Sequence, residues 1–105
     1  MSGFGFLGMD AAIEDIIRFI DAIEPIPAWH DWCIGITDDA DRSLYEEHRA
    51  QHNTSIHVSV DSPETARSVK NFLIERYGMD GRPDTGEYPR TVFAFKRASD
   101  TDPPL

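Results

Sequence analysis

The chain has 105 residues and a formal net charge of −9, from 10 basic and 19 acidic side chains. This length suits one domain with one modest core. Its negative field disfavours nucleic acid as a partner, because non-specific binding needs Lys and Arg to displace counterions from phosphates. The one cysteine, Cys33, allows no internal disulfide, and no stretch approaches the ~20 apolar residues of a membrane span. We therefore expect a cytoplasmic protein without a membrane partner.

The first predicted element is an amphipathic helix over residues 10–24, with Asp10 as its N-cap. Phe19 lies off its apolar stripe, so this ring either widens the buried face or contacts a second copy of the chain. A homodimer through helix 10–24 follows from the second alternative. Residues 1–9 are expected to be a flexible N-terminus, and residues 10–97 a single domain. The apolar stripe has the three-and-four spacing of a buried helix face and consists of Ile13, Ile16, Ile17, Ile20 and Ile23.

A strand is predicted over residues 32–37, where side chains alternate between two faces. Trp32, Ile34 and Ile36 should face the core, and Cys33, Gly35 and Thr37 should face the other way. Gly35 has no Cβ, so another group can approach the backbone there. An acidic turn and a short helix over residues 38–49 are expected to follow, with Arg42 one turn into the helix, able to meet a phosphate or a carboxylate beside Thr37.

This segment resembles part of the GIY-YIG endonuclease domain, through residues 33–37, Arg42 and His48. The resemblance implies two catalytic tyrosines on paired strands, an arginine on the next helix and a metal-binding glutamate on a later one. Here Cys33 stands in the place of the second tyrosine, and Lys70 stands near the place of the glutamate. Without these groups both proton transfer and metal binding are lost. The resemblance therefore implies a degenerate relative without a cofactor.

The second half of the chain is predicted to hold a strand over 55–60, a helix over 63–77, a glycine-rich loop over 78–90 and a strand over 91–97. Ser62 and Pro63 are typical of a helix start, and Gly78 is typical of its end. The loop is either a flexible excursion or a close approach to a ligand, with charge from Arg82 and Arg90. Residues 98–105 are expected to be a disordered tail.

The best site follows from the polar faces of two strands. If strand 55–60 lies beside strand 32–37, four polar side chains share one face, with Arg42 at its rim. Cys33 is then either an activated thiolate beside His57 or a small buried residue. His48 and His52 lack a further ligand at a recognisable spacing, so no metal site is predicted. The candidate binding residues are Cys33, Thr37, Arg42, His48, His57 and Ser59.

The order helix, strand, helix, strand, helix, strand predicts an α+β domain, with about three helices on a three-stranded sheet. A small parallel βαβαβ arrangement is the alternative. If strand 91–97 pairs with strand 32–37, it takes the place of the family's first strand, as in a circular permutation. Phe93 or Phe95 would then stand where a catalytic tyrosine belongs.

These observations lead to three hypotheses about function. The first is a non-catalytic, GIY-YIG-like binding or regulatory module with a protein partner, which the lost tyrosines and glutamate and the acidic charge favour. The second is a nuclease or other phosphodiester-processing enzyme that uses Arg42. The third is an oligomerising module for protein interaction through helix 10–24.

Overall fold

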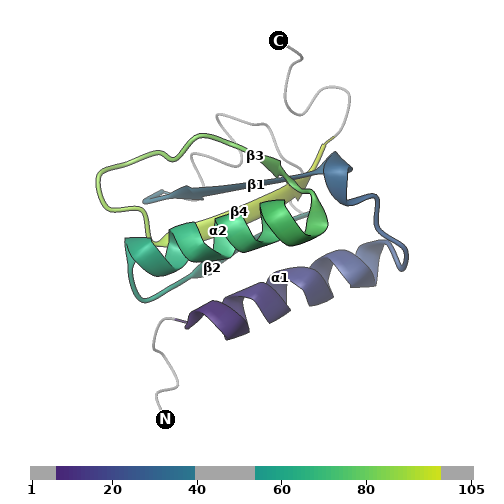
Figure 1. Ribbon diagram of the computed structural model, residues 1–105, viewed down its shortest axis with the longest axis horizontal. Helices are drawn as coiled ribbons and strands as arrows, with labels where there is room; N and C mark the ends of the chain where they lie inside the picture. Colours follow the sequence, from purple (N-terminus) through teal and green to yellow (C-terminus); the bar gives the residue numbers. More distant parts are fainter. Residues whose placement is uncertain (1–6, 40–53, 98–105) are drawn as a thin grey trace.

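The computed structural model describes residues 7–39 and 54–97. It shows one compact α+β domain, in which two α-helices pack on a mixed sheet of four strands (Figure 1). The helix predicted over residues 38–49 lies outside the described residues from residue 40 onward. The elements in chain order are α1 (Met9–Ile23), the 3-10 helix η1 (Trp29–Asp31), β1 (Trp32–Thr37), β2 (Ser55–Ser59), α2 (Pro63–Tyr77), β3 (Asp80–Gly81) and β4 (Thr91–Lys96).

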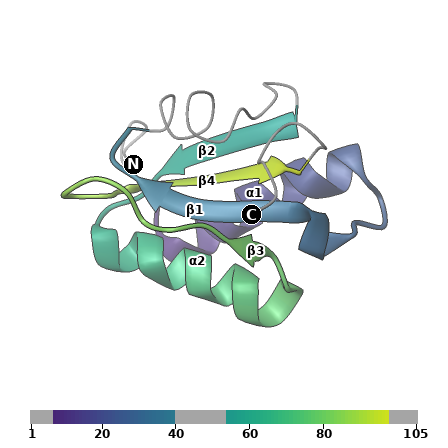
Figure 2. The ribbon, with the colours of Figure 1, turned by 90° about the horizontal axis from the view of Figure 1, so that it is seen from above.

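The strand order is β2-β4-β1-β3, as Figure 2 shows from above. β4 is antiparallel to both of its neighbours, and only β1 and β3 run parallel. The expectation of three strands is therefore wrong by one, and the parallel βαβαβ alternative is wrong. The condition that β2 lies beside β1 is also not met, because β4 lies between them. The pairing of β4 with β1, on which the permuted arrangement depends, is confirmed.

The extra strand comes from the glycine-rich loop. β3 has only two residues, too few for an alternating apolar pattern, so nothing in the local sequence distinguishes it from a turn. Beyond β3 the loop stays beside β1. The N–H of Arg82 donates to the carbonyl of Ile34 at 2.7 Å, and the N–H of Thr85 donates to that of Ile36 at 3.1 Å. The loop therefore runs parallel to β1, towards the C-terminal end of that strand, and is not the flexible excursion that was one of the two expectations (Figure 2).

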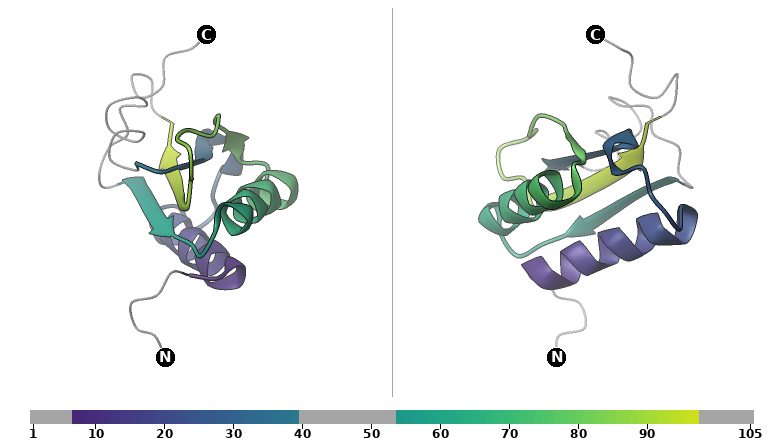
Figure 3. Two further views of the ribbon diagram at one scale, coloured as in Figure 1. Left: turned by 90° about the vertical axis from the view of Figure 1, so that its left-hand side faces the viewer. Right: turned by 45° about the vertical axis from the view of Figure 1, so that its right-hand side comes forward.

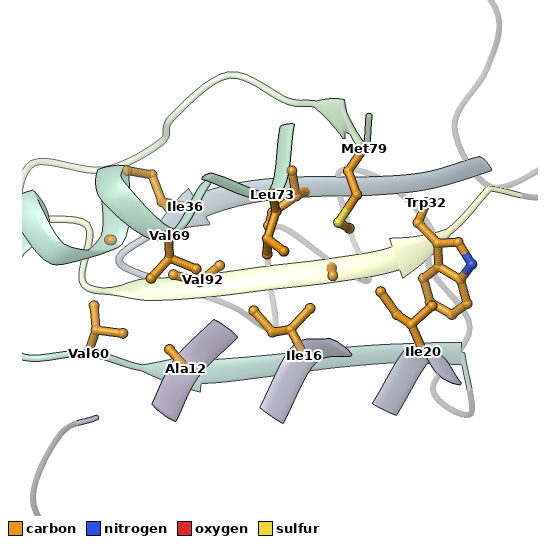
Figure 4. Close-up of a cluster of buried hydrophobic side chains, with 13 residues drawn as sticks. Ala12, Ile16, Ile20, Trp32, Ile36, Val60, Val69, Leu73, Met79 and Val92 are labelled. Atoms are coloured by element: carbon orange, nitrogen blue, oxygen red, sulfur yellow. The ribbon is translucent and has the colours of Figure 1, made fainter. Parts of the chain in front are cut away.

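Both helices lie on the same face of the sheet (Figure 3). The predicted inward residues of β1, Trp32, Ile34 and Ile36, are all fully buried there. Phe19 packs its ring against Trp32 in an edge-on contact, with centroids 6.3 Å apart, so it widens the buried face of α1. Each helix contributes a row of buried side chains to the core: Ala12, Ile16 and Ile20 from α1, and Ala66, Val69 and Leu73 from α2. Figure 4 labels all of them except Ala66.

The helix ends confirm the predictions for α2 and correct the one for α1. Gly78 ends α2 in the left-handed region with φ of 78°, as its position predicted. Asp10, by contrast, is in the first turn of α1 and does not cap it, because the N-cap is Gly8. The domain also begins before residue 10, since Leu7 forms a parallel bridge with Val60.

Ser62 caps α2 as predicted, and its removal should be measurable. Its hydroxyl accepts a hydrogen bond from the N–H of Thr65 at 3.1 Å. We expect Ser62→Ala to lower the free energy of unfolding by about 1 kcal/mol, because that N–H loses its acceptor. Urea denaturation measures the change. Ser68→Ala, at an exposed position of the same helix, is the control. Equal effects of the two substitutions would contradict a role of the cap.

Within the described ranges, no helix has the length and apolar character needed to cross a membrane.

Candidate functional site

The second face of the sheet, away from the helices, carries the candidate residues that the structure describes. The strand register arranges this face in three rows. Cys33, Phe95 and Ser55 form the first row. Gly35, Phe93 and His57 form the second, and Thr37, Thr91 and Ser59 the third. Arg42 and His48 lie outside the described residues.

Two phenylalanines fill the centre of this face. Phe93 and Phe95 are fully buried, as is Cys33, and the two rings stack with centroids 6.2 Å apart. Because both rings belong to β4, they separate the polar residues of β1 from those of β2. The predicted semi-polar face is therefore an apolar cluster with polar residues at its margins.

Gly35 is the position that lets the Phe93 ring lie on the sheet. A Cβ on Gly35 would lie 2.5 Å from the Cζ atom of Phe93, closer than carbon atoms approach. The room predicted at Gly35 is thus used by a side chain of the same domain.

Cys33 and His57 are not brought together. They stand in different rows on the two strands that flank β4, so this register does not pair them as a thiol and its base. One partner of the thiol is Arg97, whose Nη2 lies 3.6 Å from Cys33 Sγ. Arg97 also pairs with Asp80, which in turn accepts a hydrogen bond from Arg82 at 3.1 Å. These ion pairs connect β3 to the end of β4.

Thr37 and Ser59 both lie at one end of the sheet, in the same row, with Thr91 between them. Thr37 is buried, and its hydroxyl oxygen accepts hydrogen bonds from the N–H of Asp39 at 3.0 Å and from the hydroxyl of Thr85 at 2.7 Å. Its role here is to hold the turn after β1 and the loop together. Ser59 is exposed at the same end.

A small pocket lies at this end of the sheet, with a volume of about 140 Å³. We call it the strand-end pocket. Its lining includes residues with one carboxylate, one guanidinium and three hydroxyl groups, from the turn after β1, the end of β2, the loop before β4 and the start of β4. Its lining residues are Asp38, Ser59, Tyr88, Arg90 and Thr91.

The loop holds Asp38 in place at the pocket. The N–H of Glu87 donates to Asp38 Oδ2 at 3.1 Å. The neighbouring Gly86 has φ of 92°, and a Cβ there would collide with the Asp38 carboxylate, so only glycine allows this approach. On the other side, the guanidinium of Arg90 lies over the ring of Tyr88, 5.4 Å from its centroid.

A larger groove lies on the other side of the molecule, between α1 and α2, with a volume of about 590 Å³. We call it the helix groove. In its apolar lining, Ile13, Ile17 and Phe72 are half-buried, and Met9 is 36% exposed. Arg76 lies beside it, with its guanidinium over the ring of Phe72. The residues that line the helix groove are Met9, Asp10, Ile13, Glu14, Ile17, Arg18 and Phe72.

Sequence reasoning missed both features as sites. Arg90 was noted only as a charge in the loop, and Asp38 only as part of an acidic turn before a helix. The one signal for the strand-end pocket is the run of glycines and prolines over 78–90, which permits a close approach of the loop. The helix groove had a signal in Ile13 and Ile17, but periodicity alone does not show which apolar residues a neighbouring helix leaves uncovered.

Searches against protein-family models, curated proteins and solved structures gave no match to this chain. In residues 7–39 and 54–97, no group of three His, Cys, Asp or Glu side chains is arranged to hold a metal ion. The two pockets and their charges are therefore the observations on which a functional proposal depends.

Proposed function

We propose that the protein is a non-catalytic binding module that holds a basic amphipathic helix of a partner protein in the helix groove. The observation that carries this proposal is the apolar floor of the groove, where Met9, Ile13, Ile17 and Phe72 stay partly open to solvent. A groove of this kind between two helices suits the apolar face of a third helix. Burial of these side chains would supply the main free energy of binding.

Charge favours a basic partner over a second copy of the chain. The net charge of −9 repels another copy and attracts a cationic helix over distances of a Debye length. The surface of α1 is also negatively charged, because its one arginine, Arg18, is paired with Glu14 at 2.9 Å. The exposed carboxylates of α1 are Asp10, Glu14, Asp15 and Asp21.

The degenerate GIY-YIG relationship is part of the same proposal. Its support is the antiparallel pairing of β1 with β4, which sets Phe93 opposite Gly35 and Phe95 opposite Cys33. In the permuted arrangement these phenylalanines would replace a catalytic tyrosine without its hydroxyl. A ring that cannot transfer a proton favours a binding role over cleavage.

The test uses two fluorescently labelled synthetic helices with the same leucine face, one with lysines and one with glutamates on the polar face. We expect the basic helix to raise the anisotropy of the label saturably, and the acidic helix to have no effect. Added salt should weaken the binding, because it screens exposed charges. Equal binding of the two helices would contradict the proposal.

Ile17→Glu should weaken binding of the basic helix by roughly tenfold or more, because it places a charge on the apolar floor of the groove. Ala11→Glu adds the same charge to an exposed position of α1 outside the groove, and should leave the affinity unchanged or slightly higher. Light scattering completes the test. A dimer that Ile17→Glu dissociates would show that a second copy occupies the groove, and would overturn the proposal of a basic partner.

A further inference from the structure

The helix groove carries different charges at its two ends. The helices α1 and α2 run in the same direction, from ends that both lie close to Val60 (Figure 1). The first turn of each helix contains an acid, Asp10 in α1 and Glu64 in α2. The last turn of α2 contains a base, Arg76. The groove between the helices therefore has an acidic end, where both helices begin, and a basic end, where α2 finishes.

These end charges are accessible to a partner. Asp10 and Arg76 are exposed, and neither forms an ion pair within the described part of the chain. The Arg76 guanidinium lies over the ring of Phe72, 5.6 Å from its centroid, and Phe72 lines the groove. Between the two ends, Arg18 and Glu14 pair with each other, so they leave the difference between the ends unchanged.

A partner helix matches these charges in one direction. The dipole of an α-helix favours carboxylates in its first turn and lysines or arginines in its last turn. A helix with this distribution of charge brings its lysines to Asp10 only when its C-terminus lies at the start of α1. In that orientation its first-turn carboxylates lie at Arg76. The reverse orientation brings like charges together at both ends, which lowers specificity-determining electrostatic complementarity.

The length of the groove sets the spacing of the partner's charges. Between Met9 and Ile17, which both line the groove, α1 rises by about 12 Å. The complementary charges of the partner are therefore about two helical turns apart, on either side of its apolar side chains. From these observations we infer that the helix groove holds its partner antiparallel to α1 and α2, with a carboxylate near the partner's N-terminus at Arg76 and a lysine near its C-terminus at Asp10. This inference rests on the proposed function and adds the direction of the bound helix to it.

The experiment uses a synthetic helix with a leucine face, a glutamate in its first turn and lysines in its later turns. A nitroxide label is attached to one end or to the other, and the full chain is labelled with ¹⁵N for NMR. We expect the N-terminal nitroxide to broaden the amide signals of Arg76 and Gly78, and the C-terminal nitroxide to broaden those of Gly8 and Asp10. The opposite pattern, or equal broadening at both ends by each label, would overturn the inference and leave the proposed function intact. A synthetic helix that does not bind at all would overturn both.

A charge reversal tests the cause of the orientation. Arg76→Glu should weaken binding of this helix by about threefold to tenfold, because an attraction at the edge of the groove becomes a repulsion. A second helix, with lysine in place of the first-turn glutamate, should bind Arg76→Glu more tightly than the first helix does, which loss of the contact with Phe72 alone would not produce.

Arg67→Glu is the control for Arg76→Glu, because it makes the same change at an exposed position of α2 outside the groove. It should leave the affinity for the first helix nearly unchanged. Thermal unfolding of each variant shows that it is folded. Equal effects of the two substitutions, or no recovery of Arg76→Glu with the second helix, would overturn the inference.

Discussion

Ile16→Ala is expected to lower the free energy of unfolding by about 2–5 kcal/mol, the range for deletion of buried methyl groups. Ile16 is fully buried, and it lies between α1 and the sheet in Figure 4. Its truncation removes transfer free energy and leaves a cavity, because the surrounding side chains relax only in part. Urea denaturation followed by tryptophan fluorescence measures the loss, since Trp32 belongs to the same core.

Ile26→Ala is the matched control, because it is the same chemical change at a side chain that is 93% exposed. We expect a change within about 0.5 kcal/mol there. Similar losses for the two variants would mean that α1 does not pack on the sheet. The result also bears on the helix groove, since the groove exists only if the inner side of α1 is held in place.

The second large effect is expected for Gly35→Ala, at about 1–3 kcal/mol of lost stability. The added Cβ would lie 2.5 Å from Phe93 Cζ, and the ring cannot easily move, because it stacks on Phe95 in a buried cluster. Strain of this kind is typical of overpacked cores. Urea denaturation again gives the free energy of unfolding.

A double-mutant cycle with Phe93→Leu tests the cause. Leucine lacks the ring atom that meets the new methyl group, so the loss in the double variant should be smaller than the sum of the two single losses. Strict additivity of Gly35→Ala and Phe93→Leu would show that the Phe93 ring is not what excludes a side chain at residue 35.

The helix groove and the strand-end pocket are separate. The helix groove is lined by α1 and α2, whereas the strand-end pocket is lined by strand ends and the loop before β4. Asp38→Asn therefore should not affect binding of the basic helix.

Much of the secondary structure could be predicted, because its signals are local. The isoleucine spacing located α1, and the start and stop residues Ser62 and Gly78 located α2. Alternation assigned Trp32, Ile34 and Ile36 of β1 to the core. These patterns reflect helix and strand periodicity, which each segment carries by itself.

The candidate site could be predicted only in part. Cys33, Thr37, His57 and Ser59 lie on one face in the observed register, because alternation decides which side of a strand a residue occupies. The predicted convergence of these four side chains is not found. Alternation could not predict that β4 separates them, because it says nothing about which strand lies between two others. Phe93 and Phe95 fill the position where a polar site was expected.

The sequence by itself therefore determined the type of α1, α2, β1, β2 and β4, their ends to within one residue, and the inner and outer faces of β1 and β2. Only the tertiary structure decided the strand order, the short β3 and the two candidate sites. Each of these depends on contacts between segments far apart in the chain, such as Gly86 against Asp38, or on α1 and α2 lining one groove with Ile13 and Phe72. Local periodicity carries no information about such long-range contacts, because they depend on the packing of the whole domain.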